Sequence, residues 1–217
     1  MINGIDVSDF QNVEWPAVKA AGYSWGYAKA TEGTDDAQTS FPGRLVSAQA
    51  AGLDAGAYHF MTWDEDPQQQ LDNFLANYIP KSGDLTPMLD CEEDTNAAPG
   101  TRYRPKPSEV VGRMAVFLDG LTARLGNDIL PLIYGPREFI EAYLGGGDFA
   151  GHPLWIAEYH APPPPTSVDG FERISIWQHT GNGQIAGITD PNTGLPTEVD
   201  LSYFLGDSGA LAKLRLP

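Results

Sequence analysis

The stretch Leu85-Thr86-Pro87-Met88-Leu89-Asp90-Cys91-Glu92 is an apolar run that ends in two acidic residues, one position apart. Its length and composition are typical of a buried strand that carries carboxylates at its C-terminal end. Side chains at positions i and i+2 of a strand point to the same face, about 6–7 Å apart along it. Asp90 and Glu92 are therefore expected side by side, close enough for their pKa values to be driven apart into an acid and a base.

Short apolar runs alternate with helix-like segments along the chain. The expected strands are Ile2–Val7, Ser24–Lys29, Ala55–Phe60, Thr86–Cys91, Leu130–Tyr134, Leu154–Ala157, Ile174–Gln178 and a short one near Val199. The expected helices are Trp15–Ala21, Phe41–Ala51, Pro67–Tyr78, Ser108–Leu125 and Pro136–Leu144. Several of these helices are followed by glycine, as at Gly22 and Gly52, which is a common stop signal. After residue 145 we expect loops rich in Gly, Pro and Asn to join the last strands.

About eight strands with intervening helices predict an α/β protein, a parallel (β/α) barrel whose C-terminal part is irregular. A doubly wound open sheet is the structural alternative, but no Gly-rich dinucleotide loop or phosphate loop follows any expected strand. A chain of 217 residues fits one domain, so we expect residues 1–217 to form a single barrel. The run Pro162–Pro165 is expected to be a stiff extended loop and not a domain linker.

Charge and residue usage exclude several classes of partner. The formal net charge of −16 argues against nucleic acid or an anionic membrane as the main partner. No apolar run is long enough for membrane insertion. The single cysteine, Cys91, excludes an internal disulfide and a cysteine-built zinc site. The histidines lack zinc-ligand spacing, although clustered acids could hold a divalent cation through oxygen ligands. We expect no metal and no cofactor.

The C-terminal ends of the expected strands carry acids and aromatic residues. In a (β/α) barrel the working residues lie at these ends. The residues found there are Asp6, Lys29, Glu32, Tyr58, His59, Phe60, Asp90, Glu92, Tyr134, Trp155–Tyr159, Trp177, Gln178, His179 and Asp200. Four acids and several aromatic rings on one face predict a sugar-cleaving cleft, because rings stack on pyranose faces while carboxylates act on the glycosidic oxygen.

Each of these residues also has a structural explanation. A lone acid after a strand often caps the next helix or binds loop amides, and Asp6 could cap the turn at Ser8-Asp9. Trp155 and Trp177, taken singly, fit a core as well as a sugar platform. A serine nucleophile has little support, because the sequence has no Gly-x-Ser-x-Gly elbow. Four carboxylates in one cleft cannot all be ionised at low cost, so we expect Glu92, beyond the strand end, to keep its proton near neutral pH.

Eight short blocks of the sequence resemble the lysozymes of glycoside hydrolase family 25, in order and along essentially the whole chain. The blocks are Gly4-Ile5-Asp6-Val7-Ser8 with Gln11, Lys29-Ala30-Thr31-Glu32-Gly33, Ala57-Tyr58-His59-Phe60, Leu89-Asp90-Cys91-Glu92, Ile133-Tyr134, Leu154-Trp155-Ile156-Ala157, Ile176-Trp177-Gln178 and Val199-Asp200-Leu201. Any one block is weak evidence, but eight in register are strong. The resemblance implies a flattened, irregular barrel whose last strands lack regular helices.

The resemblance also implies N-acetylmuramidase activity on bacterial peptidoglycan, at the β-1,4 bond from N-acetylmuramic acid to N-acetylglucosamine. Glu92 then corresponds to the general acid/base. Asp90 corresponds to its partner, which either orients the substrate's 2-acetamido group or stabilises the charge at the anomeric carbon. Asp6 and Asp200 correspond to two further acids of the catalytic set. The residues expected to bind substrate are Tyr58, Tyr134, Trp155, Gln178, Lys29 and Glu32.

Three features depart from the family pattern. The segment Thr189–Glu198 looks longer than usual, His179 stands where an aromatic such as tyrosine is expected, and Glu93-Asp94 adds charge beside the acid pair. A barrel that binds wall glycans without cutting them, and a hydrolase of chitin-like polymers, are the alternative functions.

We expect a monomer with no appended wall-binding module. The N-terminus shows no signal peptide. The chain is therefore expected to reach the wall through a holin-type pore, as a phage endolysin does, or an injection apparatus, or to be secreted with its leader removed.

Overall fold

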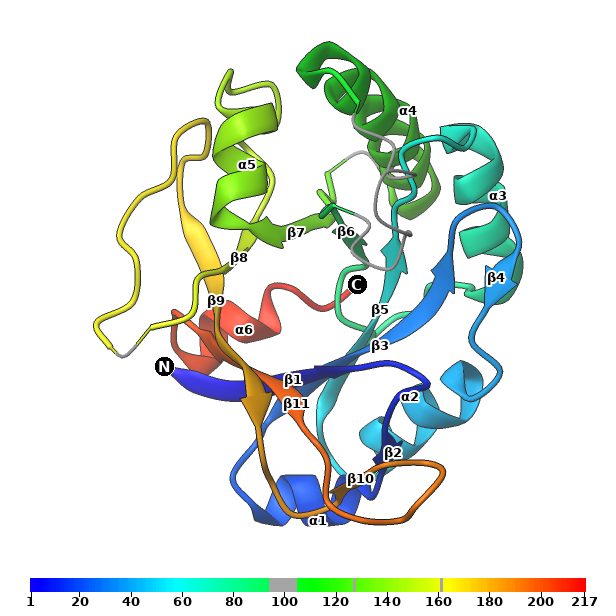
Figure 1. Ribbon diagram of the computed structural model, residues 1–217, viewed down its shortest axis with the longest axis vertical. Helices are drawn as coiled ribbons and strands as arrows, with labels where there is room; N and C mark the ends of the chain where they lie inside the picture. The colour runs from blue at the N-terminus through cyan, green and yellow to red at the C-terminus, as the bar shows by residue number, and fades with distance from the viewer. Residues whose placement is uncertain (94–104, 127, 161) are drawn as a thin grey trace.

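Eight strands close into a barrel (Figure 1). The computed structural model describes residues 1–93, 105–126, 128–160 and 162–217. The barrel strands are β1 (Ile2–Val7), β3 (Trp25–Glu32), β5 (Asp54–Phe60), β6 (Met88–Asp90), β7 (Leu132–Pro136), β8 (Leu154–Ala157), β9 (Ile174–Gly183) and β11 (Val199–Phe204). Their order around the barrel is β1-β11-β9-β8-β7-β6-β5-β3, and pairing of β1 with β3 closes it. The predicted barrel is confirmed, and the open doubly wound alternative is excluded.

The last barrel strand runs against its neighbours. Strands β1, β3 and β5 to β9 form parallel pairs, whereas β11 is antiparallel to both β1 and β9. The barrel is therefore mixed and not wholly parallel as predicted. Because β11 runs backwards, its N-terminal end lies beside the C-terminal end of β1. Residues near the start of β11 thus reach the rim where the parallel strands end.

Three short strands lie outside the closed ring of barrel strands. β4 (Asp36–Ala37) forms a hairpin with β3, while β2 (Asn12–Val13) pairs with β10 (Ile188–Thr189) in a separate two-stranded ribbon. None of the three was predicted, because two-residue strands carry no alternating pattern.

Helices surround the barrel, except the last one, which lies at one end of it (Figure 1). They are α1 (Trp15–Ala20), α2 (Phe41–Ala50), α3 (Pro67–Asn77), α4 (Pro107–Leu125), α5 (Arg137–Leu144) and α6 (Ser208–Ala212). The first five agree with the predicted helices to within two residues at each end. Among the described residues no helix lies between β8 and β9, as expected, and none is long and apolar enough to cross a membrane.

The helix α6 was missed by the sequence patterns, because five residues are too few to show a helical period. The Asp207 side chain caps it by accepting a hydrogen bond from Ala210 N at 2.8 Å. Leu211 is buried in the barrel interior, and the backbone of Thr86, just before β6, donates to Leu214 O at 2.7 Å. The C-terminal segment therefore closes the barrel on the side where β6 begins, opposite the acids.

Several strand boundaries differ from prediction, and that of β6 affects the acids. β6 ends at Asp90, although Cys91 N still donates to Tyr134 O at 2.8 Å. Glu92 lies beyond the strand, so the same-face rule for strands places Asp90 but not Glu92. β7 begins at Leu132, two residues later than expected.

Aromatic side chains fill the barrel interior. Trp25, Tyr27 and Trp155 pack edge to face, with ring centroids 5.3–6.2 Å apart. Gly4 and Gly56 make room for these rings, because a Cβ at Gly4 would lie 2.0 Å from Trp25 and one at Gly56 would lie 2.5 Å from Tyr27. A second apolar layer lies between the strands and the surrounding helices. The interior layer forms a rigid floor beneath the barrel mouth.

Candidate active site

Four carboxylates meet at one end of the barrel. Asp6 stands near the end of β1, Asp90 is the last residue of β6, Glu92 follows two positions later, and Asp200 is the second residue of β11. The pKa of each of the four is shifted by the charge of another or by a hydrogen bond with it. The acids that lie far apart in the sequence therefore form one electrostatic cluster, as predicted.

Asp6 and Asp200 form one pair within this cluster. They are directly opposite each other in the antiparallel ladder of β1 and β11, and their side chains share a hydrogen bond. Burial raises the pKa of Asp6 well above its usual value, and the Asp200 charge raises it further. Burial raises the pKa of Asp200 to about 6, while the hydrogen bond with Asp6 opposes that rise. The two carboxyl groups therefore titrate as a coupled pair, in which burial and mutual repulsion oppose ionisation of both at once.

Asp90 and Glu92 form the second pair. Burial, and then the Glu92 charge, raise the pKa of Asp90. Burial, and then the Asp200 charge, raise the pKa of Glu92 to about 7, while the Lys29 ammonium opposes the rise. Asp90 is only 6% exposed, and its Oδ1 has no hydrogen-bond partner among the described residues. The deeper acid thus offers an unused acceptor, and the two carboxyl groups titrate as a coupled pair.

Gln178 connects the acids to the aromatic wall. Its Oε1 accepts hydrogen bonds from Tyr134 Oη at 2.9 Å and Tyr159 Oη at 2.8 Å. Its Nε2 donates to Asp6 Oδ2 at 3.1 Å. Because Gln178 is 1% exposed, these bonds fix its amide in one orientation. The side chain predicted to bind substrate therefore orders three residues of the site.

Two cavities open beside Glu92. One of about 570 Å³ is lined by Glu92, Tyr134, Pro136, Glu138, Ala157, Glu158, Tyr159 and His160. The other, of about 370 Å³, is lined by Glu92, Glu93, Pro136, Glu138, Phe139, Ala142 and Tyr143. Glu92 borders both cavities, whereas Asp6, Asp90 and Asp200 border neither. Of the four acids, Glu92 is the one that meets a molecule entering from this side.

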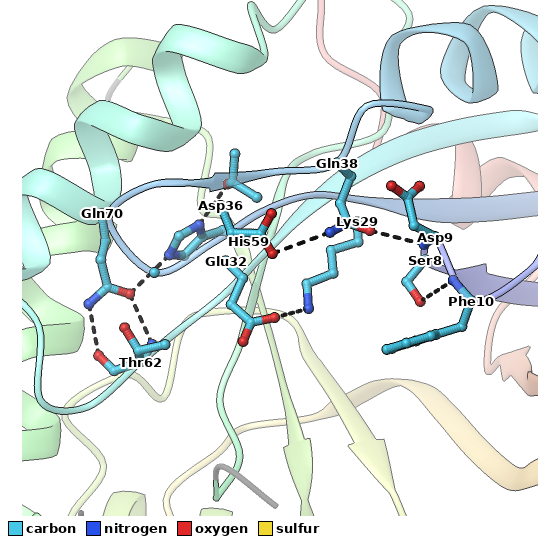
Figure 2. Close-up of polar contacts among 12 residues, drawn as sticks. Ser8, Asp9, Phe10, Lys29, Glu32, Asp36, Gln38, His59, Thr62 and Gln70 are labelled. Carbon is cyan, nitrogen blue, oxygen red and sulfur yellow. Dashed lines mark hydrogen bonds and ion pairs between the residues drawn. The ribbon is translucent and has the colours of Figure 1, made fainter. Parts of the chain in front are cut away.

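Lys29 and Glu32 lie at the end of β3, on another part of the barrel mouth. Figure 2 shows the ion pair between the Lys29 ammonium and the Glu32 carboxylate. The ammonium also stands 4.6 Å from the centre of the Phe60 ring. Lys29 is 8% exposed, so its charge acts through a medium with little water and reaches both Asp90 and Glu92. The contact of Lys29 and Glu32 with substrate stays a prediction.

His59 lies at the end of β5 but is turned away from the acids. Its Nδ1 accepts from Thr31 Oγ1 at 2.8 Å, and its Nε2 donates to Gln70 Oε1 at 3.1 Å. Figure 2 shows the contact between His59 and Gln70. The ring stacks on Phe117 at 4.9 Å. Burial lowers the pKa of His59 to about 4, so it is neutral at physiological pH. We assign it to holding β3, β5 and α3 together.

The structure places the predicted substrate residues at different depths. Tyr58 and Tyr134 lie beside the acids, whose charges, together with burial, raise the pKa of both hydroxyls. Trp155 is 0% exposed and its Nε1 donates to Ser202 Oγ at 3.1 Å. The predicted sugar contact of Trp155 is therefore corrected, because a ring buried in the floor cannot stack on a ligand.

Tyr159 provides the accessible ring that the sequence did not single out. It is 60% exposed, lines the larger cavity and bonds to Gln178. Gly181 gives it space, since a Cβ there would lie 3.1 Å from the Tyr159 hydroxyl and 3.2 Å from Asp200 Oδ1. Its position just after β8 was the available signal.

The family departures have partial structural explanations. Residues 190–195 form a turn in which Asp190 Oδ1 accepts from Asn192 N at 2.9 Å and Thr193 N at 2.8 Å. His179 stacks on Tyr203 at 4.4 Å, away from the acids. Asp94 lies outside the described residues. Within the described part of the chain, no group of three His, Cys, Asp or Glu side chains is arranged to hold a metal ion.

Comparison with known proteins gives consistent matches. Residues 5–188 match the family described as "Glycosyl hydrolases family 25". Lysozyme M1 from Streptomyces globisporus is 30% identical over 220 residues, which cover 98% of this chain and 71% of that protein. An N,O-diacetylmuramidase from Arthroderma benhamiae is 29% identical over 197 residues, with 86% and 80% covered. The bacterial lysozyme from Streptomyces coelicolor is similar in structure, with a TM-score of 0.86, 28% identity, and 99% and 96% of the two chains covered.

Proposed function

Because the chain belongs to glycosyl hydrolase family 25, we propose that it cleaves the β-1,4 bond between N-acetylmuramic acid and N-acetylglucosamine in bacterial peptidoglycan. The resemblance noted in the sequence is confirmed: the chain is a glycoside hydrolase of the lysozyme type, and peptidoglycan is its substrate. The similarity to an N,O-diacetylmuramidase supports muramic acid as the sugar whose glycosidic bond is cut.

The observation that carries the assignment of roles is the position of Glu92. It is the one of the four acids that borders both cavities, and its pKa of about 7 lets it hold a proton at neutral pH. We assign it as general acid for the leaving oxygen and then as general base for water. Asp90, buried deeper with a free Oδ1, accepts the N–H of the substrate's 2-acetamido group. Burial, and then the charge of Asp200, raise the pKa of Glu92.

Cleavage proceeds in two steps under this assignment. Glu92 first gives its proton to the glycosidic oxygen while the C1–O bond of the muramic acid residue breaks. The acetamide oxygen attacks C1, and the Asp90 carboxylate stabilises the positive charge of the ring so formed. Glu92 then removes a proton from water, whose oxygen attacks C1 and displaces the acetamide oxygen. This substrate-assisted route is one of the known exceptions to the enzyme-linked intermediate.

The test is digestion of purified bacterial walls followed by identification of the new reducing ends. We expect muramic acid at these ends. Glucosamine at the ends would instead support a hydrolase of chitin-like polymers or a glucosaminidase. Walls that are bound without cleavage would support the glycan-binding alternative. Glu92→Gln should abolish release of reducing ends, with an unchanged circular dichroism spectrum as the control for folding.

The proposed place of action is the bacterial cell wall. The route to it, whether through a holin-type pore, an injection apparatus or secretion, stays a prediction from the sequence, as does the monomeric state. Negative charge on both protein and wall gives no long-range attraction between them. Binding must then depend on short-range contacts within the cleft.

A further inference from the structure

The loop that follows β1, residues 8–11, holds an exposed aromatic ring at the barrel mouth. Phe10 is 74% exposed, more than any other large apolar side chain in the described part of the chain. It lies four positions after Asp6, so its loop leaves the barrel directly from the acid cluster. A single exposed apolar residue is ordinary on a protein surface. The loop that carries Phe10 is what distinguishes it.

Residues 8–11 are held in place by polar contacts at both ends of the loop. The Arg44 guanidinium from α2 donates to the carbonyls of both Ser8 and Gln11, at the two ends of the loop. It also pairs with Asp9 Oδ1 at 3.6 Å. The loop closes on itself through Gln11 N to Ser8 O at 3.1 Å and Ser8 N to Gln11 Oε1 at 3.0 Å.

Two neighbouring segments brace the same loop. Asp9 N donates to Gln38 Oε1 at 2.9 Å, which ties it to the segment after β4 (Figure 2). Gln11 Nε2 donates to Glu198 O at 3.4 Å, just before β11. The backbone of Phe10 therefore has little freedom, while its ring has no apolar cover. Because the backbone that carries the ring is already fixed, less conformational entropy is lost when a ligand packs on Phe10.

Phe10 stands across the barrel mouth from the cavity wall already described. In the closed order of eight strands, β1 is four strands away from β7, which carries Tyr134. Tyr159, after β8, lines the cavity on that far side. In Figure 2 the Phe10 ring extends from its loop toward the side of the Lys29–Glu32 pair, which also borders the mouth. A linear polymer that crosses the acids from Tyr159 would leave on the side of Phe10.

We propose that Phe10 is the platform of a distal sugar subsite, on which the apolar face of an N-acetylhexosamine ring of the glycan strand stacks. This inference rests on the proposed function and extends it from the cleaved bond to a sugar bound farther along the glycan strand. An aromatic ring suits the apolar face of a pyranose, and the acids at the centre need a strand that is held on both sides. The stem peptide is the competing occupant that the experiment distinguishes.

The test measures binding without cleavage, in the Glu92→Gln background, by isothermal titration calorimetry. The ligand is a set of wall glycan strands from which an amidase has removed the stem peptides. Phe10→Ala should weaken binding about threefold to tenfold, the range expected for one stacked ring. Phe10→Trp should retain wild-type affinity. Ile79→Ala is the matched control, because Ile79 is 61% exposed and lies after α3, away from the mouth.

Several outcomes would overturn the subsite. Equal affinity of Phe10→Ala and Ile79→Ala for the strands would do so, even if the wall digest yields muramic acid ends. An effect seen only with strands that keep their peptides would assign the ring to the stem peptide. An equal penalty for a disaccharide would place Phe10 at the acids and not at a distal site. By contrast, failure of the muramidase assay with the Phe10 effect on strands retained would reject the bond assignment but keep the subsite.

Discussion

Replacement of Asp200 by Asn should make the protein more stable at alkaline pH. The folded state raises the pKa of Asp200 from 3.8 to about 6. A carboxyl group with a raised pKa binds its proton more tightly when folded. The contribution is therefore favourable at low pH and is lost as pH rises between these two values. Above pH 6 the folded state carries the full cost of an ionised, mostly buried Asp200 beside Asp6.

The size of the effect follows from the shift. Roughly 2 pKa units correspond to about 3 kcal/mol, which solvent around the partly exposed Asp200 reduces to about 1–2 kcal/mol. Asn keeps the acceptor oxygen for the Asp6 hydroxyl but cannot ionise. At pH 8 we expect Asp200→Asn to raise the free energy of unfolding by that amount. At pH 4, where Asp200 itself is largely protonated, the two proteins should be about equally stable.

Urea denaturation followed by tryptophan fluorescence at pH 4 and pH 8 gives both free energies. Asp35→Asn is the matched control, because Asp35 is exposed and the substitution changes the net charge equally. It should shift stability by less than about 0.5 kcal/mol at either pH. If Asp200→Asn is no more stable than wild type at pH 8, or if both variants gain equally, the proposed burial of charge at this pair is refuted.

Three further outcomes are expected. The kcat/KM for wall hydrolysis should fall about tenfold per pH unit above the Glu92 pKa of about 7. Lys29→Met should move this fall to higher pH, because the ammonium lowers the Glu92 pKa. Full activity at pH 9 would contradict the acid role. Gln178→Leu should lower the free energy of unfolding by about 2–3 kcal/mol, because it leaves the buried hydrogen-bond partners Tyr134 and Asp6 unsatisfied. An unchanged urea midpoint would show that the hydrogen bonds of Gln178 are dispensable. EDTA should leave the rate of wall lysis unchanged, whereas a loss restored by added Ca²⁺ would assign a metal to the acids.

The position of the acids was predictable because parallel strands share one carboxyl end. Once strand and helix runs alternate, Asp6, Asp90 and Glu92 must reach the same rim. Their pairing was not predictable, because nothing in the run around Val199 shows that the strand runs backwards. The register that sets Asp6 opposite Asp200 follows only from that reversal.

The depth of each side chain along the barrel axis could not be predicted from the sequence either. Trp155 and Ala157 are two positions apart on β8, so both face the barrel interior, as the period of two in a strand predicts. Ala157 lines the cavity, whereas Trp155 lies one layer deeper and is covered. Which layer reaches solvent depends on how far the strand projects, and the exposed ring falls instead on Tyr159, outside the strand.

The antiparallel insertion of β11 has a consequence for the timing of assembly. Among the described residues β11 is the last barrel strand in chain order, yet it fills the gap between β1 and β9 and supplies Asp200. Until it docks, β1 and β9 have open edges, the barrel is unsealed, and the acid cluster lacks a member. The barrel is thus catalytically incomplete until β11 has emerged and docked, so activity depends on synthesis of this strand.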